Sequence, residues 1–173
     1  AVQKGAAASA TYDDAFAATL TSVNSAVYQN ALYFAGTNGE MWRVSAGGAP
    51  VLWQDGSVFH GFISRMYVIG DRLYLVDWDT SGQYKQTLWR YDGAADKLDE
   101  IVTYSEIDDI AGMGDSVYFS VQQYADPPLE GSLLLRLPLT ATQPTPVSSA
   151  FTLAGDKSIG SIESGGDLLY LSV

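Results

Sequence analysis

The stretch Gly70-Asp71-Arg72-Leu73-Tyr74-Leu75 carries a short apolar–Tyr–apolar core that recurs along the chain. The other copies of that core are Leu32-Tyr33-Phe34, Val117-Tyr118-Phe119 and Leu169-Tyr170-Leu171. Their first residues lie 41, 44 and 52 positions apart, which is the spacing of a repeat array rather than of one compact fold. A single short sheet cannot bury its own faces, so successive copies are expected to stack on one another.

Each copy is preceded by a turn signal, and the first three copies are followed by a second strand signal. The turn signals are Gln29-Asn30, Gly70-Asp71, Gly114-Asp115 and Gly166-Asp167. Asn, Asp and Gly tolerate the positive φ of tight hairpins, so each pair is expected to join two antiparallel strands. The second strand signals are Met41-Trp42-Arg43-Val44, Leu88-Trp89-Arg90-Tyr91 and Leu134-Leu135-Arg136-Leu137, with Arg always in the third place.

A further apolar segment precedes each turn, and another follows each second strand. The preceding segments are Val23–Tyr28, Ile63–Ile69, Ile107–Met113 and Ile159–Ser164; the following ones are Pro50–Gln54, Leu98–Tyr104 and Pro146–Leu153. The three-residue spacing of Ile63 and Met66 hints at helix, but segments this short do not form stable helices. We interpret them as inner strands with a bend or bulge. Four strands in a meander form the blade of a β-propeller, so the predicted fold is an all-β propeller, partial or small.

The second repeat resembles a known family of bacterial propeller repeats, the ELWxxDGT type. Gly70–Leu75 matches its G-x-x-L-Y-F element, and Thr87–Gly93 matches its E-L-W-x-x-D-G-T element. The first repeat matches through Glu40–Val44 but has Ser45-Ala46-Gly47 in place of Asp-Gly-Thr. The resemblance implies a β-propeller fold over residues 21–173. It implies no particular activity, because propellers include enzymes, receptors and scaffolds.

The repeats also predict how the chain is organised. Residues 1–20 are expected to form a blade-closing strand or a short helix, and the repeats are expected at 21–56, 57–104, 105–153 and 154–173. The last repeat holds only two of the four strands. Since propellers close with about four to eight blades, we expect a further segment or another chain to complete the propeller. A four-bladed closure that uses residues 6–20 is the alternative.

Composition excludes several classes of function. A formal net charge of −11 with nine Lys and Arg leaves no basic stripe for nucleic acid or anionic membranes. The absence of Cys excludes disulfides and thiolate metal sites. No apolar run reaches the roughly 18 residues of a membrane span. The chain starts at Ala1, as after cleavage of a signal peptide or excision from a longer protein, and we expect an extracellular, cell-surface or periplasmic bacterial location.

The sharpest metal-binding signal is the segment Asp77-Trp78-Asp79-Thr80-Ser81-Gly82. Oxygen ligands at alternate positions followed by Gly resemble the first half of a calcium loop. Asp77, Asp79 and Ser81, with the carbonyl group of Gln83, are therefore candidate Ca²⁺ ligands. Lys85 and Leu88 stand at the ninth and twelfth positions, where such a loop has other ligands. The alternative interpretation is a solvated hairpin turn.

Few other side chains are candidates for catalysis or metal binding. Glu106, Asp108 and Asp109 cluster in one inner strand, but adjacent strand residues point to opposite faces, so the spacing predicts no carboxylate pair. His60 is the only histidine, which excludes multi-histidine metal sites and makes any serine triad depend on it. We predict no catalytic residues and no cofactor other than the candidate calcium. The recurring arginines are expected to bind acids or carbonyl groups at sheet edges.

These observations favour a non-catalytic, extracellular or cell-surface β-propeller module. Such a module would mediate contacts with proteins or carbohydrates, or act as a scaffold. The connections between the second and third strands lengthen from 35–40 to 76–87 and 120–133, and loops that vary in this way commonly form a binding face. The alternative is a propeller hydrolase or lyase whose remaining blades lie outside this chain. No nucleic acid and no membrane span are expected.

Overall fold

The computed structural model describes residues 24–36, 39–122, 132–147 and 158–173, and every regular element in these ranges is a β-strand. The prediction of an all-β fold is confirmed. A search of the same ranges finds no helix of the length and hydropathy that would cross a bilayer. The predicted N-terminal segment 1–20, most of the loop before the third strand of the third repeat, and residues 148–153 of its fourth strand lie outside the described ranges.

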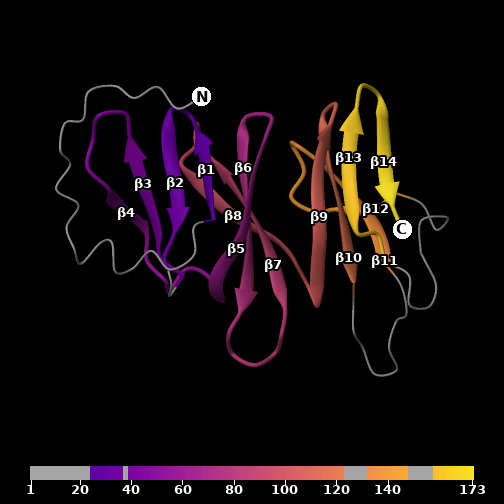
Figure 1. Cartoon of the computed structure of the whole chain (residues 1–173), viewed down its shortest axis with the longest axis horizontal. Coiled ribbons are helices and arrows are strands. Elements are labelled where there is room, and N and C mark those ends of the chain that lie inside the picture. The colour runs from indigo at the N-terminus through magenta and orange to yellow at the C-terminus, as the bar shows by residue number, and fades with distance from the viewer. Residues whose placement is uncertain (1–23, 37–38, 123–131, 148–157) are drawn as a thin grey trace.

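Four antiparallel sheets follow one another from one end of the molecule to the other (Figure 1). The first comprises β1 (Ser25–Tyr28), β2 (Ala31–Ala35), β3 (Met41–Ser45) and β4 (Val51–Gln54). The second comprises β5 (Gly61–Ile69), β6 (Arg72–Asp79), β7 (Gln86–Asp92) and β8 (Lys97–Tyr104). The third comprises β9 (Glu106–Met113), β10 (Ser116–Gln122), β11 (Ser132–Pro138) and β12 (Thr145–Pro146), and the fourth β13 (Ser161–Gly165) and β14 (Leu168–Ser172).

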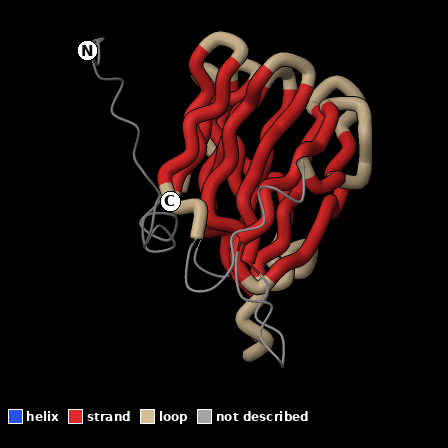
Figure 2. The backbone as a smooth tube through the Cα atoms, turned by 90° about the vertical axis from the view of Figure 1, so that its right-hand side faces the viewer, coloured by secondary structure: helices blue, strands red, loops and turns tan. Residues whose placement is uncertain are grey.

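Each four-stranded sheet is a meander, because strands that are consecutive in sequence are hydrogen-bonded neighbours in the sheet. The predicted turns connect the first and second strand of every sheet. Gln29 and Asn30 both have positive φ, 47° and 60°, and Gly70, Gly114 and Gly166 have φ of 61–62°. Their residue types therefore suit the backbone that a two-residue hairpin needs. Figure 2 shows the strands running side by side, with loops and turns at their ends.

The predicted inner strands form, and two of them contain the expected irregularity. In β5, Ile63 pairs with Asp77 and Arg65 with Val76, so one extra residue, Ser64, interrupts the ladder. The extra residue reverses the alternation of side chains, and Ile63 and Met66 consequently pack in the same core. A similar register shift in β9 brings the equivalent isoleucines, three positions apart, into one core. The three-residue spacing therefore marks a β-bulge and not a helix.

Three apolar cores fill the spaces between successive sheets. Tyr33 of the first sheet packs in the core shared with the second, and Tyr74 of the second packs in the core shared with the third. The residues beside Tyr74, Leu73 and Leu75, pack on the opposite side, against the first sheet. Each tyrosine therefore faces the next sheet, and its apolar neighbours face the previous one. Full burial of one such side chain stabilises the fold by about 1.5–3 kcal/mol.

Aromatic rings occupy the core between the first and second sheets. Trp89 is buried there and makes an edge contact with Phe59 at 5.3 Å between ring centroids. Trp53 contacts Tyr33 at 5.1 Å and Tyr91 at 4.6 Å, both edge to face. Trp89 is therefore a core residue. These rings supply the area that holds the two sheets together.

Polar side chains attach the inner strands to the sheet before them. Asn24 Nδ2 donates to the carbonyl oxygen of Ile63 at 3.1 Å, and the Gln86 side-chain oxygen accepts the amide of Ile107 at 2.9 Å. Arg65 also donates to the Ile107 carbonyl oxygen. Each of these hydrogen bonds gives a partner to a backbone N–H or C=O group near a bulge or a strand end, where the regular ladder of the sheet is interrupted.

The next sheet is attached in the same way by hydroxyl groups. Ser132 Oγ accepts the amide of Ile159 at 3.2 Å, and Ser120 Oγ donates to its carbonyl oxygen at 3.2 Å. Both serines and Ile159 are buried. The same place in three successive repeats, the isoleucine that starts the inner segment, is thus held by side chains of the preceding sheet.

The close approach of β5 and β6 yields a test of the fold. A Cβ atom on Gly61 would lie 1.9 Å from the carbonyl oxygen of Trp78, which is backbone and cannot turn away. We expect Gly61→Ala to lower the free energy of unfolding by about 1–3 kcal/mol, measured by denaturant titration. Gly160→Ala is the matched control, because the nearest atom to its Cβ is the Ser172 hydroxyl at 3.5 Å. Equal stability of the two variants would contradict this packing.

Candidate functional site

Asp77 lies at the centre of a hydrogen-bond network in the second sheet. Its Oδ2 accepts the backbone amide of His60 at 2.9 Å and Nε1 of Trp89 at 3.0 Å, and its Oδ1 accepts the amide of Thr87 at 3.1 Å. The carboxylate is fully buried. Three N–H donors thus compensate the cost of removing this charge from water and join three parts of the sheet.

The imidazole of His60 lies beside this network. Its side chain is 45% exposed, and Nδ1 lies 3.4 Å from Asp77 Oδ2 and 3.2 Å from Thr87 Oγ1. Thr87 Oγ1 also lies 2.9 Å from Thr103 Oγ1. The same ring nitrogen thus faces both the carboxylate and the hydroxyl. A Ser–His–Asp relay needs these two groups on opposite nitrogens, so this arrangement does not have the geometry of a nucleophilic triad.

The predicted calcium ligands divide between this network and an exposed loop. Asp79 Oδ1 accepts the amide of Ser81 at 2.6 Å, and its Oδ2 accepts the Ser81 hydroxyl at 2.9 Å. These two hydrogen bonds hold the pKa of Asp79 below its usual range. Gln83 lies exposed in the same loop. No group of three or more His, Cys, Asp or Glu side chains in the described ranges is placed to hold a metal ion.

The oxygens of Asp77 therefore do not fit the role of ion ligands, because they are buried and already accept three N–H groups. Calcium stays a prediction from the sequence. The structure assigns Asp77 the role of a hydrogen-bond acceptor and Asp79 that of a cap for its own turn.

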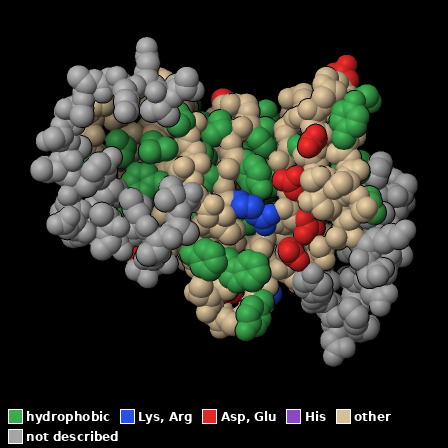
Figure 3. Space-filling view, viewed as in Figure 1, with side chains coloured by type: hydrophobic (Ala, Val, Ile, Leu, Met, Phe, Trp, Pro, Cys, Tyr) green, Lys and Arg blue, Asp and Glu red, His purple; other side chains and the backbone are tan. Residues whose placement is uncertain are grey.

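A second polar cluster lies on the inner strands of the second and third sheets. Figure 3 shows acidic side chains gathered over β9 and β13, with basic atoms beside them. Both carboxylate oxygens of Asp108 lie 3.1 Å from Gln122 Nε2, and Asp109 Oδ2 accepts the amide of Ile162 at 2.8 Å. The two adjacent carboxylates thus have different partners, one in its own sheet and one in the next.

Arg65 and Gln86 connect this cluster to the second sheet. Arg65 Nη2 donates to Gln86 Oε1 at 2.9 Å, and its Nη1 donates to the carbonyl oxygen of Asp108. Sequence reasoning singled out neither residue. The only available signal was one charged residue, Arg65, inside an otherwise apolar inner strand.

Two of the three recurring arginines, Arg90 and Arg136, make the contacts that were expected of them, whereas the buried Nε of Arg43 has no hydrogen-bond partner among the described residues. Arg90 Nη1 donates to the carbonyl oxygens of Leu139 and Ala141 at 3.1 and 2.6 Å, and its Nη2 lies 3.5 Å from Asp99. Arg136 Nη2 lies 3.2 Å from Asp115. In both sheets the guanidinium group therefore binds carbonyl or carboxylate groups of the same chain.

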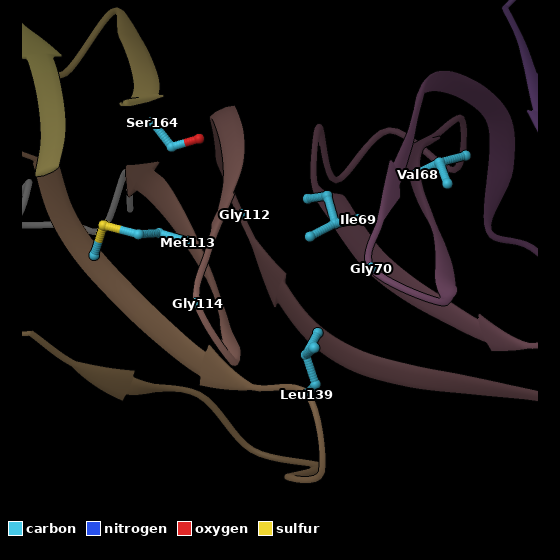
Figure 4. A pocket seen from close by; sticks show the side chains of 8 residues that line it. All are labelled: Val68, Ile69, Gly70, Gly112, Met113, Gly114, Leu139 and Ser164. Carbon is cyan, nitrogen blue, oxygen red and sulfur yellow. The ribbon is translucent and has the colours of Figure 1, made fainter. Parts of the chain in front are cut away.

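An open depression of about 390 Å³ lies where the inner strands of three sheets end (Figure 4). Its lining residues are Val68, Ile69, Gly70, Gly112, Met113, Gly114, Leu139 and Ser164. Ser164 supplies the one polar side chain among them, so the lining offers no acid, base or cationic group for chemistry. Figure 4 shows the Ile69 and Leu139 side chains beside the glycine-rich turns.

Comparison with known proteins does not assign the chain to a family. No family model matches the chain, and no curated protein is similar enough to match. The resemblance to propeller repeats of the ELWxxDGT type therefore stays an expectation from the sequence.

The calcium prediction can be tested by thermal melting. Because the oxygens of Asp77 have N–H donors in the folded protein, we expect the same melting temperature with added Ca²⁺ and with a chelator. A ligand that binds only the folded state would raise the melting temperature as its concentration rises. A rise with Ca²⁺ that is lost in Asp79→Ala would contradict the hydrogen-bond interpretation.

The inner cluster predicts a pH effect on stability. Burial raises the pKa of Asp108 above its ordinary value of 3.8; the Gln122 hydrogen bond opposes this, Glu106 and Asp109 add to it, and the Arg65 charge opposes it. A raised folded-state pKa means that ionised Asp108 destabilises the fold at neutral pH, and the loss is recovered as the pH falls through the folded pKa. Asp108→Asn should therefore raise the free energy of unfolding at pH 7, with the gain shrinking in acid.

Asp99 offers a control substitution whose expected effect on the free energy of unfolding has the opposite sign. The pKa of Asp99 is lowered, chiefly by Lys97, whose Nζ lies 2.7 Å away, and by Arg90. Asp99→Asn should therefore lower stability at pH 7, and this loss should disappear as the pH falls through the folded pKa of Asp99. Denaturant titrations across a pH series measure both. A less stable Asp108→Asn at pH 7 would refute the assignment.

Proposed function

We propose that the four sheets are blades of a β-propeller and that the chain is a non-catalytic binding module. The proposal is supported by three consecutive four-stranded meanders, of which the second and third are packed on neighbouring sheets through both faces. The polar side chains that resemble catalytic groups, Asp77 and Asp108 among them, are hydrogen-bonded to other parts of the sheets. Such contacts support a structural role for these groups.

One observation carries the binding role: the loop between β6 and β7 presents an exposed aromatic ring from a fixed backbone. Tyr84 is 71% exposed and has a φ of 51°, a left-handed conformation that is uncommon for a bulky residue. The loop is closed by the amide of Asp79, which donates to the Lys85 carbonyl oxygen at 2.8 Å, and by the Asp79 cap on Ser81. Preorganised aromatic side chains are effective contacts for proteins and sugars.

We therefore place the contact face at the ends of the sheets where this loop protrudes (Figure 1). The ligand is a protein or a carbohydrate. A location outside the cytoplasm, at the bacterial surface or in the periplasm, completes the proposal.

A propeller hydrolase or lyase is the second candidate, and the raised pKa of Asp108 favours it. A carboxyl group that stays protonated at higher pH can act as a general acid. In such an enzyme, Asp108→Asn would abolish activity toward a polysaccharide without unfolding the chain. If the chain is a binding module, we expect that the wild-type chain releases no reducing ends from a polysaccharide.

Affinity electrophoresis through gels that contain soluble polysaccharides tests the binding role. We expect Tyr84→Ala to weaken binding by about tenfold, or about 1.4 kcal/mol, for any polysaccharide that retards the wild-type chain. Tyr84→Phe should retain most of the binding if ring stacking is responsible. Tyr170→Ala, which removes another exposed tyrosine, is the matched control. Retardation unchanged in Tyr84→Ala would exclude this loop as the contact face, and no retardation by any polysaccharide would leave proteins as the ligand class.

A further inference from the structure

Arg43 differs from the other recurring arginines in what surrounds its guanidinium group. It lies in β3, directly opposite Tyr33 of β2 and Val51 of β4. Its Nε is buried, and no group in the described part of the chain accepts a hydrogen bond from it. None of the ion pairs between described residues includes Arg43. A buried donor without a partner is rare in folded proteins and costs free energy, so it calls for an acceptor from outside the fold.

The second sheet shows what an arginine in this position pairs with. The equivalent row there is Tyr74, Arg90 and Asp99. Arg90 Nη1 donates to two carbonyl oxygens of the connection between β11 and β12, and its Nη2 lies 3.5 Å from Asp99. In the first sheet, Val51 stands where the second sheet has Asp99, and an isopropyl group accepts no hydrogen bond. The acid that partners Arg90 therefore has no counterpart beside Arg43 in β4.

This row is accessible from solution at the edge of the interface between the first two sheets. Tyr33 packs in the core between these sheets, so the row faces the second sheet. Arg43 is partly exposed, and Val51 beside it is 50% exposed. Trp53 of β4 is also partly exposed and makes an edge contact with the Tyr33 ring at 5.1 Å. A ligand at Arg43 would therefore meet one cation together with aromatic and aliphatic side chains.

The chemistry of this row favours a carboxylate with an apolar body. A guanidinium group has five N–H donors in a planar fork, which matches the two oxygens of a carboxylate or a phosphate. The chain carries a formal net charge of −11, which repels a dianionic phosphate ester more strongly than a monoanion. The rings of Tyr33 and Trp53 and the side chain of Val51 offer apolar area to the rest of the ligand.

We propose that Arg43 is a binding site for a small organic acid, a monocarboxylate with an aromatic or aliphatic body. The carboxylate pairs with the guanidinium group of Arg43 as Asp99 pairs with Arg90, and the body packs beside Val51. Figure 1 shows β3 and β4 well apart from the loop between β6 and β7, which carries Tyr84. The site therefore stands or falls independently of the proposed contact face at that loop.

Benzoate and benzamide provide the probes, because they share a ring and a similar size and differ in charge. We expect benzoate to cause a saturable shift of the Arg43 Nε–H resonance in an NMR titration of the full chain. That resonance is identified by its loss in Arg43→Lys. Benzamide at the same concentrations should leave it unchanged. Phenyl phosphate should bind at least fivefold more weakly than benzoate.

Two substitutions of equal charge separate this site from a general effect of net charge. Arg43→Met should abolish saturable binding of benzoate, followed on the ring protons of the ligand. Arg136→Met removes the same charge from the equivalent strand of the third sheet and should leave benzoate binding unchanged. Because Arg43 forms no ion pair with a described residue, Arg43→Met should keep the melting temperature close to that of the wild type.

A third substitution supplies the missing acid within the chain. Val51→Asp places a carboxylate where the second sheet has Asp99, so it should compete with benzoate and weaken its binding at least tenfold without lowering the melting temperature. Equal responses to benzoate and benzamide, no saturable shift, or benzoate binding that persists in Arg43→Met would overturn the proposal. The same shift with sodium chloride at equal ionic strength would also overturn it. Tighter binding of phenyl phosphate would overturn the choice of a carboxylate.

Discussion

The whole arrangement depends on apolar side chains on both faces of the inner sheets, which the neighbouring sheets bury. The central strand of a sheet presents its tyrosine to the next sheet and the apolar residues beside it to the previous one. Neither face could be left in water without losing about 1.5–3 kcal/mol for each large side chain. Each sheet buries one face of its neighbour and presents an equivalent apolar face of its own, which the next sheet then covers.

Polar residues have a structural task in this arrangement. Stacked sheets meet at inner strands whose ladders are interrupted by bulges, and interrupted ladders leave backbone groups without partners. Arg65, Gln86, Ser120 and Ser132 supply those partners. Asp77 does the same within the second sheet for three N–H groups. Residue types that are common in active sites are thus used to position strands, which is why their presence alone does not indicate catalysis.

Local patterns were enough to predict the strands, the hairpins and the bulges. Residues such as Asn30 and Gly70 determine the backbone of their own turns. Consecutive apolar residues, such as Leu73-Tyr74-Leu75, report on strands that are packed on both faces. The three-residue spacing of Ile63 and Met66 was ambiguous between helix and bulge, and segment length decided it correctly. The roles of Arg90 and Arg136 also followed from the sequence, because a charge in a largely apolar strand needs a nearby acceptor.

The partners of the polar groups were beyond the reach of sequence. Asp77 and Asp79 occupy alternate positions and looked alike, yet one is buried under three donors and the other caps an exposed turn. Asp108 and Asp109 are adjacent, yet one contacts its own sheet and the other the next sheet. The sequence by itself determined the repeating strands and turns, because these depend on neighbours a few residues away. Tertiary structure alone decided which carboxylates are buried and what they bind, because those partners lie between 10 and 53 residues away and meet only when the sheets stack.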